Sequence, residues 1–291
     1  MSEDLKKLFG DYTEGKVTRR DFIRKSVLLT GSLAVANTLL ESLTPPETPA
    51  AMVDPRDSTI LWHNVDYQGK AGPISGYLAR PAGPGRFPGV VVIHENRGLD
   101  AHIEDVTRRL AKEGFVALAP DYVSRAGGTK KVNPKGGGIG NIREIATESS
   151  VVEDTASSLA YLRTLTDVRG GGMGVVGFCW GGGMSLITAT QLPEIRAAVV
   201  YYGESPKSLD TLKNLKGPVL AHYAENDGPR NRGIPATEKA MRQFNKSYTY
   251  KIYPGSQHAF NNDTRADRYH PAAAKEAWVK TLEFLRKNLQ S

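Results

Sequence analysis

The feature that most constrains the fold is a glycine-flanked turn between a buried strand and a helix. The apolar run Met173 to Phe178 leads directly into Cys179 in the pattern Gly-x-Cys-x-Gly, and a helix is expected over residues 184–191. Such a tight turn forces its central residue into a strained backbone conformation that only small neighbours permit. The pattern predicts a nucleophile elbow, with Cys179 projected at the N-terminus of a helix.

From about Asp54 onward, short apolar runs alternate with helix-length amphipathic segments. This alternation predicts an α/β fold with a mostly parallel central sheet and helices on both faces. The continuous apolar run Gly89 to His94 is typical of a central strand covered on both sides. The other expected strands are 59–67, 74–78, 115–119, 173–178, 197–201, 219–223 and 248–253.

Cys179 is the single cysteine, so the chain has no internal disulfide. At a helix N-terminus the exposed N–H groups and the helix dipole favour a thiolate, and the N–H of Trp180 is a candidate donor to an oxyanion. The alternative is that Cys179 is a buried structural cysteine, which is the usual fate of an unpaired thiol.

A cysteine nucleophile needs a base and a group that orients the base, in the chain order nucleophile, acid, histidine. Asp227 follows the expected strand 219–223, and His258 follows the strand 248–253. We expect His258 to exchange the thiol proton and Asp227 to fix the histidine tautomer. Glu225 is a rival for the acid. We expect no metal site, because the histidines show no metal-binding spacing, and no organic cofactor.

The segment after the strand 89–94 carries a second set of candidates. The main-chain N–H of Asn96 is a candidate for the second oxyanion donor. Glu95 beside it is unusual, because a carboxylate would repel an oxyanion. A partnership between Glu95 and Cys179 would account for its presence.

The N-terminal residues 1–51 are expected to form an appendage to a catalytic domain over residues 52–291. Arg19 and Arg20 precede Phe22, and fifteen residues without a charge follow, Ser26 to Leu40. This layout is similar to a twin-arginine signal, and it predicts export through that machinery to the periplasm, with no stable membrane span in the mature form. The alternative is an amphipathic helix on a cytoplasmic protein.

The net charge and one glycine-rich segment indicate which kinds of ligand the chain can bind. The charge of +7 comes without an Arg/Lys block, so it favours anionic small molecules over nucleic acid. The segment 125–141 holds six glycines but lacks the Gly-Lys-Ser/Thr ending of a phosphate-binding loop. We expect it to form a mobile flap near the site.

Together, the cysteine elbow, the Asp and His positions and His94-Glu95-Asn96-Arg97-Gly98-Leu99 resemble the dienelactone hydrolase (carboxymethylenebutenolidase-like) family of the α/β-hydrolase superfamily. The resemblance spans about residues 60–289. It implies that a Cys-His-Asp triad opens an enol-lactone through a thioester, and that Glu95 holds the resting thiol and then helps to deprotonate it. It also implies that Arg125, in Pro120-Asp121-x-x-x-Arg125, grips a substrate carboxylate and that Tyr201 and Tyr202 line the pocket.

The chain departs from that family's pattern at one position. Family members that use dienelactone carry a second carboxylate-binding arginine four residues after the histidine, whereas this chain has Asn262 there. Arg265 and Arg268 are candidates to replace it. Losing one charge-assisted contact costs ~1.5–3 kcal/mol of binding, enough to change substrate preference about tenfold.

The sequence therefore predicts an enzyme that hydrolyses a small ester or lactone by thiolate attack. Acyl transfer to an acceptor other than water would use the same residues. A non-catalytic ligand-binding protein on a hydrolase scaffold is the alternative from another class.

Overall fold

The computed structural model describes residues 3–13, 17, 19–32, 35 and 52–289. The chain divides into two units, one within residues 1–50 and one over residues 51–291. The first unit contains the helices α1 (Glu3–Thr13) and α2 (Arg19–Thr30). Within the described residues, no helix is long and apolar enough to cross a membrane. Residues 33–34 and 36–40 of the expected uncharged stretch, and the proline-rich residues 44–49 after it, lie outside the described residues, and the export signal stays a prediction.

An eight-stranded sheet forms the centre of the second unit, in the order β1-β2-β4-β3-β5-β6-β7-β8. The six strands β4, β3, β5, β6, β7 and β8 are parallel to one another. By contrast, β1 pairs antiparallel with β2, and β2 pairs antiparallel with β4. The predicted α/β fold with a mostly parallel sheet is confirmed, and each of the eight expected strands lies in it. The strands are β1 (Ile60–Gly69), β2 (Gly72–Pro81), β3 (Gly89–Ile93), β4 (Val116–Pro120), β5 (Met173–Phe178), β6 (Ile195–Tyr201), β7 (Val219–Asn226) and β8 (Tyr248–Gln257).

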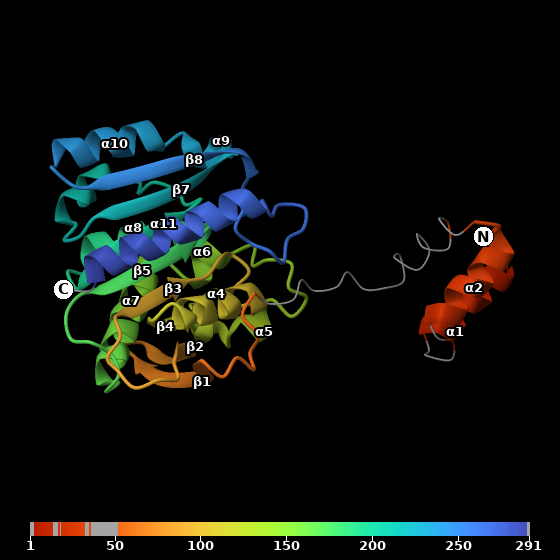
Figure 1. Cartoon of the computed structure of the whole chain (residues 1–291). Helices are drawn as coiled ribbons and strands as arrows, with labels where there is room; N and C mark the ends of the chain where they lie inside the picture. The colour runs from red at the N-terminus through yellow and green to blue at the C-terminus, as the bar shows by residue number, and fades with distance from the viewer. Residues whose placement is uncertain (1–2, 14–16, 18, 33–34, 36–51, 290–291) are drawn as a thin grey trace. The chain divides into compact units, whose positions relative to one another are not determined.

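Helices cover both faces of this sheet, and Figure 1 shows α4 and α11 crossing in front of it. Side chains alternate along a strand, so Val90 and Val92 of β3 lie on the α4–α11 side, while Val91 and Ile93 lie on the side of α7 and α8. Burying each such side chain contributes about 1.5–3 kcal/mol, which explains why β3 is apolar throughout. The helices are α4 (Ala101–Lys112), α7 (Glu148–Thr164), α8 (Trp180–Gln191), α10 (Ile234–Gln243) and α11 (Pro271–Leu289).

The carboxyl ends of five neighbouring parallel strands carry the candidate residues. Glu95 follows β3, Cys179 follows β5, Tyr202 follows β6, Asp227 follows β7 and His258 follows β8. Parallel strands present these ends at one edge of the sheet, which is where α/β folds bind their ligands. The order β3-β5-β6-β7-β8 therefore gathers residues that are far apart in the chain.

The glycine-rich segment 125–141, expected as a flap, is held by hydrogen bonds. The 3₁₀ turn η1 (Ser124–Ala126) overlaps its start, α5 (Thr129–Val132) lies within it, and α6 (Ile142–Ile145) follows directly after it. The Leu99 N–H donates to Thr129 Oγ1 at 2.9 Å, and the Ile139 N–H donates to the Asn96 carbonyl at 2.8 Å. The segment is thus attached to the turn that follows β3.

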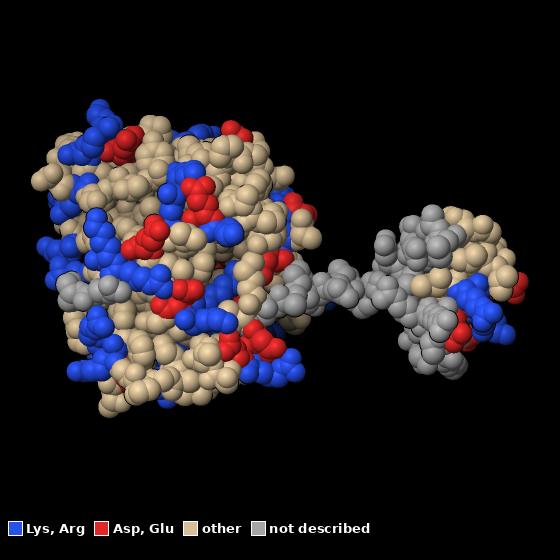
Figure 2. Space-filling view, in the orientation of Figure 1, with Lys and Arg blue, Asp and Glu red and all other residues tan. Residues whose placement is uncertain are grey.

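Basic and acidic side chains are mixed on the face that carries α11 (Figure 2). On this helix Glu276 pairs with Lys251 at 2.5 Å, and Arg286 pairs with Glu113 at 2.5 Å. Such exposed pairs contribute little stability, about 0–1 kcal/mol each. The mixture leaves the positive net charge dispersed on this face.

Candidate active site

Cys179 has the strained backbone that the elbow pattern predicts. Its φ is +56° and its ψ is −117°, and α8 begins at the next residue, four residues earlier than expected. A Cβ on Gly177 would lie 1.9 Å from the carbonyl oxygen of Gly181, and a Cβ on Gly181 would lie 2.4 Å from that of His94. Only glycine allows these close approaches, and the thiol is left partly exposed at the helix N-terminus.

A continuous chain of contacts joins the thiol to a carboxylate. His258 Nε2 lies 3.1 Å from Cys179 Sγ, and His258 Nδ1 lies 2.5 Å from Asp227 Oδ2. Asp227 is buried, whereas its rival Glu225 is exposed and accepts a hydrogen bond from the Gly255 N–H at 2.8 Å. Of the two acids, the structure brings Asp227 to the histidine.

The pKa of His258 reflects this position between two acceptors. Burial lowers the pKa of the imidazole, but the hydrogen bonds and electrostatic interactions with Asp227 and Cys179 outweigh burial and raise this pKa to about 9. A histidine with this pKa is protonated at neutral pH and donates from both ring nitrogens. The arrangement therefore stabilises a proton on His258 next to the sulfur.

Glu95 is buried in the turn after β3 and has two side-chain partners. Its Oε1 accepts from the Tyr202 hydroxyl at 3.2 Å, and its Oε2 accepts from Asn262 Nδ2 at 2.9 Å. Among the described residues, no hydrogen bond joins Glu95 to Cys179. The expected partnership between them is not formed here, because Tyr202 and Asn262 hold the carboxylate while His258 holds the sulfur.

The two expected tyrosines lie in different surroundings. The Tyr202 ring packs edge-on against His258 with centroids 5.1 Å apart, so Tyr202 contacts the site. Tyr201 is fully buried, with its hydroxyl 2.8 Å from Thr281 Oγ1 and its ring stacked on Phe178. Tyr201 therefore belongs to the core behind the site.

Two main-chain N–H groups are the candidate oxyanion donors. Trp180 is the first residue of α8, where a helix offers its N–H groups no internal acceptor. The N–H of Asn96 has no backbone or side-chain acceptor within residues 52–289, while its carbonyl accepts from Ile139. Within the described residues, neither of the two expected oxyanion donors is hydrogen-bonded to another acceptor.

The three arginines expected as substrate anchors are paired elsewhere. Arg125 donates to Asp154 on α7 at 2.6 Å. Arg265 and Arg268 both pair with Asp267, at 2.8 and 3.1 Å. None of the three lines the pocket that contains Cys179.

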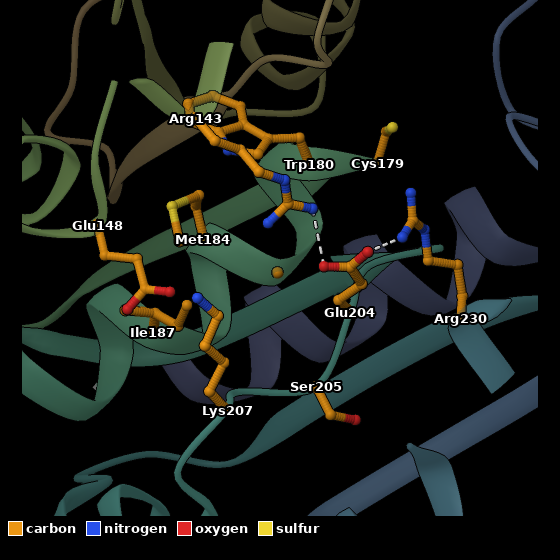
Figure 3. A pocket seen from close by; sticks show the side chains of 11 residues that line it. Arg143, Glu148, Cys179, Trp180, Met184, Ile187, Glu204, Ser205, Lys207 and Arg230 are labelled. Carbon is orange, nitrogen blue, oxygen red and sulfur yellow. Dashed lines mark hydrogen bonds and ion pairs between the residues drawn. The ribbon is translucent and has the colours of Figure 1, made fainter. Parts of the chain in front are cut away.

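That pocket is bordered instead by charged residues that the sequence analysis did not single out (Figure 3). Trp180, Met184 and Ile187 of α8 form its apolar wall. No sequence pattern distinguishes the charged residues from ordinary solvated ones. They are Arg143, Glu148, Glu204, Lys207 and Arg230.

Comparisons with known proteins agree on one group. The sequence model described as "Dienelactone hydrolase family" matches residues 74–289. A Saccharolobus solfataricus protein named "Putative carboxymethylenebutenolidase" is 31% identical over 77% of this chain and 97% of its own length. A Bradyrhizobium protein named "Probable 2-oxo-3-(5-oxofuran-2-ylidene)propanoate lactonase" is 36% identical over 73% of this chain and 89% of its own length. A crystal structure titled as a "Putative Dienelactone Hydrolase" from Klebsiella pneumoniae superposes with a TM-score of 0.71 at 28% identity, covering 78% of this chain and 99% of the other.

Proposed function

The chain belongs to the dienelactone hydrolase family, and from this premise we propose that it hydrolyses a small ester or lactone through a thioester on Cys179. Relatives whose names describe a butenolidase and a lactonase support a lactone or ester substrate. The observation that carries the cysteine mechanism is the contact chain from Cys179 Sγ through His258 to Asp227, with distances of 3.1 and 2.5 Å.

In the proposed first step, the Cys179 thiolate attacks the acyl carbon and a C–S bond forms. The N–H groups of Trp180 and Asn96 stabilise the negative charge that develops on the acyl oxygen. When the ester C–O bond breaks, the protonated His258 gives its proton to the leaving oxygen, and Asp227 holds the ring in the orientation that allows this transfer.

In the second step, water hydrolyses the thioester. His258 takes a proton from the water, the new C–O bond forms, and the C–S bond breaks to release the acid and restore the cysteine. Because Glu95 forms no hydrogen bond with Cys179 in this structure, the proposal routes neither proton transfer through it. Its role in deprotonating the thiol, which the family resemblance implies, stays a prediction.

The proposal is tested with the purified full chain and its Cys179→Ala variant, assayed on dienelactone and on uncharged aryl esters. We expect turnover that disappears in the variant, and a covalent acyl adduct on Cys179 by mass spectrometry after rapid quenching. Turnover retained by Cys179→Ala would overturn the mechanism. Product formed with an added alcohol or amine in place of water would indicate acyl transfer, and ligand binding without turnover would indicate a binding protein.

A further inference from the structure

The pocket beside Cys179 is lined by three basic side chains from separate parts of the chain. Arg143 comes from α6, Lys207 from the segment after β6, and Arg230 from α9 (Gly228–Asn231). Two acidic side chains, Glu148 and Glu204, line the same pocket. The lining thus carries one more positive than negative charge, within a cavity that also contains the thiol.

Glu204 holds two of the basic groups in place. Its Oε2 accepts from Arg143 Nη2 at 2.8 Å, and its Oε1 pairs with Arg230. Figure 3 shows the two guanidinium groups reaching Glu204 from opposite sides. A guanidinium has five N–H donors, and each of these pairs uses only part of them, so both arginines retain donors for a further anion.

The main chain that carries Glu204 is fixed against the elbow helix. A Cβ on Gly203 would lie 2.3 Å from the carbonyl carbon of Gly182 in the first turn of α8. This close approach ties the position of the Glu204–arginine group to the helix that begins next to Cys179. The basic groups therefore lie at a set place relative to the nucleophile.

Lys207 is the basic group that has no internal partner. It is exposed, and no carboxylate within the described residues forms an ion pair or hydrogen bond with it. In Figure 3 its side chain extends toward Ile187 and Glu148, on the side of the pocket away from Arg230. A lysine ammonium left without a partner in a cavity is ready to receive an anionic ligand group.

We propose that Arg143, Lys207 and Arg230 bind an anionic group of the substrate, and so select esters or lactones that carry one negative charge. The inference rests on the proposed hydrolase function and assigns its charge selectivity to this group instead of to Arg125, which is paired with Asp154. Glu204 limits the selectivity to a single charge, because it already compensates part of the positive charge and repels a second anion.

The test compares two aryl esters of similar length, 4-nitrophenyl hydrogen succinate, which is anionic, and 4-nitrophenyl pentanoate, which is neutral. We expect Lys207→Met to lower kcat/KM for the succinate about tenfold or more through KM, and to leave the pentanoate within about twofold. Lys239→Met, at an exposed lysine on α10 outside the pocket, is the matched control and should change neither substrate.

The outcomes separate this inference from the hydrolase proposal. Equal losses on both esters, or no loss on either, in Lys207→Met would overturn the anion site while Cys179-dependent turnover of the pentanoate still supported the hydrolase. A wild-type chain that turns over neither ester nor dienelactone would overturn both. Circular dichroism of each variant shows that a loss does not come from unfolding.

Discussion

Asn262 Nδ2 donates a hydrogen bond of 2.9 Å to Glu95 Oε2 across 167 residues of chain. Both side chains are buried, and the second Glu95 oxygen accepts from the Tyr202 hydroxyl. The resemblance to the family implies an arginine at this position in members that use dienelactone. In this chain the position gives Glu95 a neutral donor, and it leaves the pocket to obtain its positive charge from other residues.

This contact predicts a stability cost at Asn262. Asn262→Leu keeps a similar volume but removes the donor to the buried Glu95 oxygen and the Oδ1 acceptor of the Thr264 N–H and hydroxyl. We therefore expect the free energy of unfolding to fall by about 1–3 kcal/mol. Urea denaturation measures the change. Asn141→Leu, at an exposed asparagine with no side-chain hydrogen bond, is the control and should have little effect.

A second prediction separates Asp227 from Glu225. Asp227→Asn removes the acceptor that fixes His258, and we expect kcat/KM on the aryl esters to fall by up to ~10⁴. Glu225→Gln changes a nearby carboxylate that contacts only the Gly255 N–H, and it should keep activity close to that of the wild type. The reverse ranking would assign the orienting acid to Glu225.

The raised pKa of His258 predicts the alkaline limit of activity. With a pKa of about 9, the histidine keeps its proton through neutral pH and loses it as the pH rises through that value. The resting arrangement, in which a protonated His258 lies beside the sulfur, is lost with that proton, so we expect kcat/KM to decline above about pH 9. In Asp227→Asn the decline should begin at lower pH, because a group that raises the pKa is gone. An unchanged alkaline limit in this variant would contradict the assignment.

A site residue can be predicted from the sequence when neighbouring residues or the order of the strands determine its position. Cys179 is predictable because the glycines of its turn permit only one kind of geometry, and the close approaches at Gly177 and Gly181 are the physical reason. Asp227 and His258 follow from strand order, since each comes directly after a strand whose apolar run is visible in the sequence.

The remaining contacts depend on loop conformation and on partners far away in the chain. Nothing near Arg125 indicates that Asp154 pairs with it, and nothing near Glu95 indicates Asn262. Arg143 lies on the one-turn helix α6 and Lys207 in the segment after β6, and neither stretch is long enough to show a periodicity in the sequence. Only the folded chain brings the two side chains to the pocket.

The twin-arginine pattern predicts that export depends on its two arginines. The double substitution Arg19→Lys and Arg20→Lys keeps the charge of the segment but removes the guanidinium pair, and we expect the protein to accumulate in the cytoplasm of a bacterial host. Cell fractionation and immunoblotting measure its distribution. Arg24→Lys is the matched control and should leave export unchanged. Equal periplasmic levels of both variants would argue against this signal.

A buried group of ionisable side chains, Asp263, His102 and Arg109, predicts how the stability of the fold depends on acid pH. Asp263 accepts from His102 Nδ1 at 3.0 Å and pairs with Arg109 at 2.8 Å. Burial raises the pKa of the Asp263 carboxyl, but the interactions with His102 and Arg109 outweigh burial. The resulting pKa is about 2, below the ordinary value of 3.8.

A carboxylate with a depressed pKa stabilises the folded state above pH 3.8, and this contribution is lost as the pH falls through about 2. We therefore expect Asp263→Asn to lower the free energy of unfolding by roughly 2 kcal/mol at neutral pH, and to weaken its pH dependence between about pH 4 and 2. Urea denaturation at several pH values measures both. Asp210→Asn, at an exposed aspartate that pairs only with Lys213, is the control. If the two variants lose stability equally, the buried group is not the source of the effect.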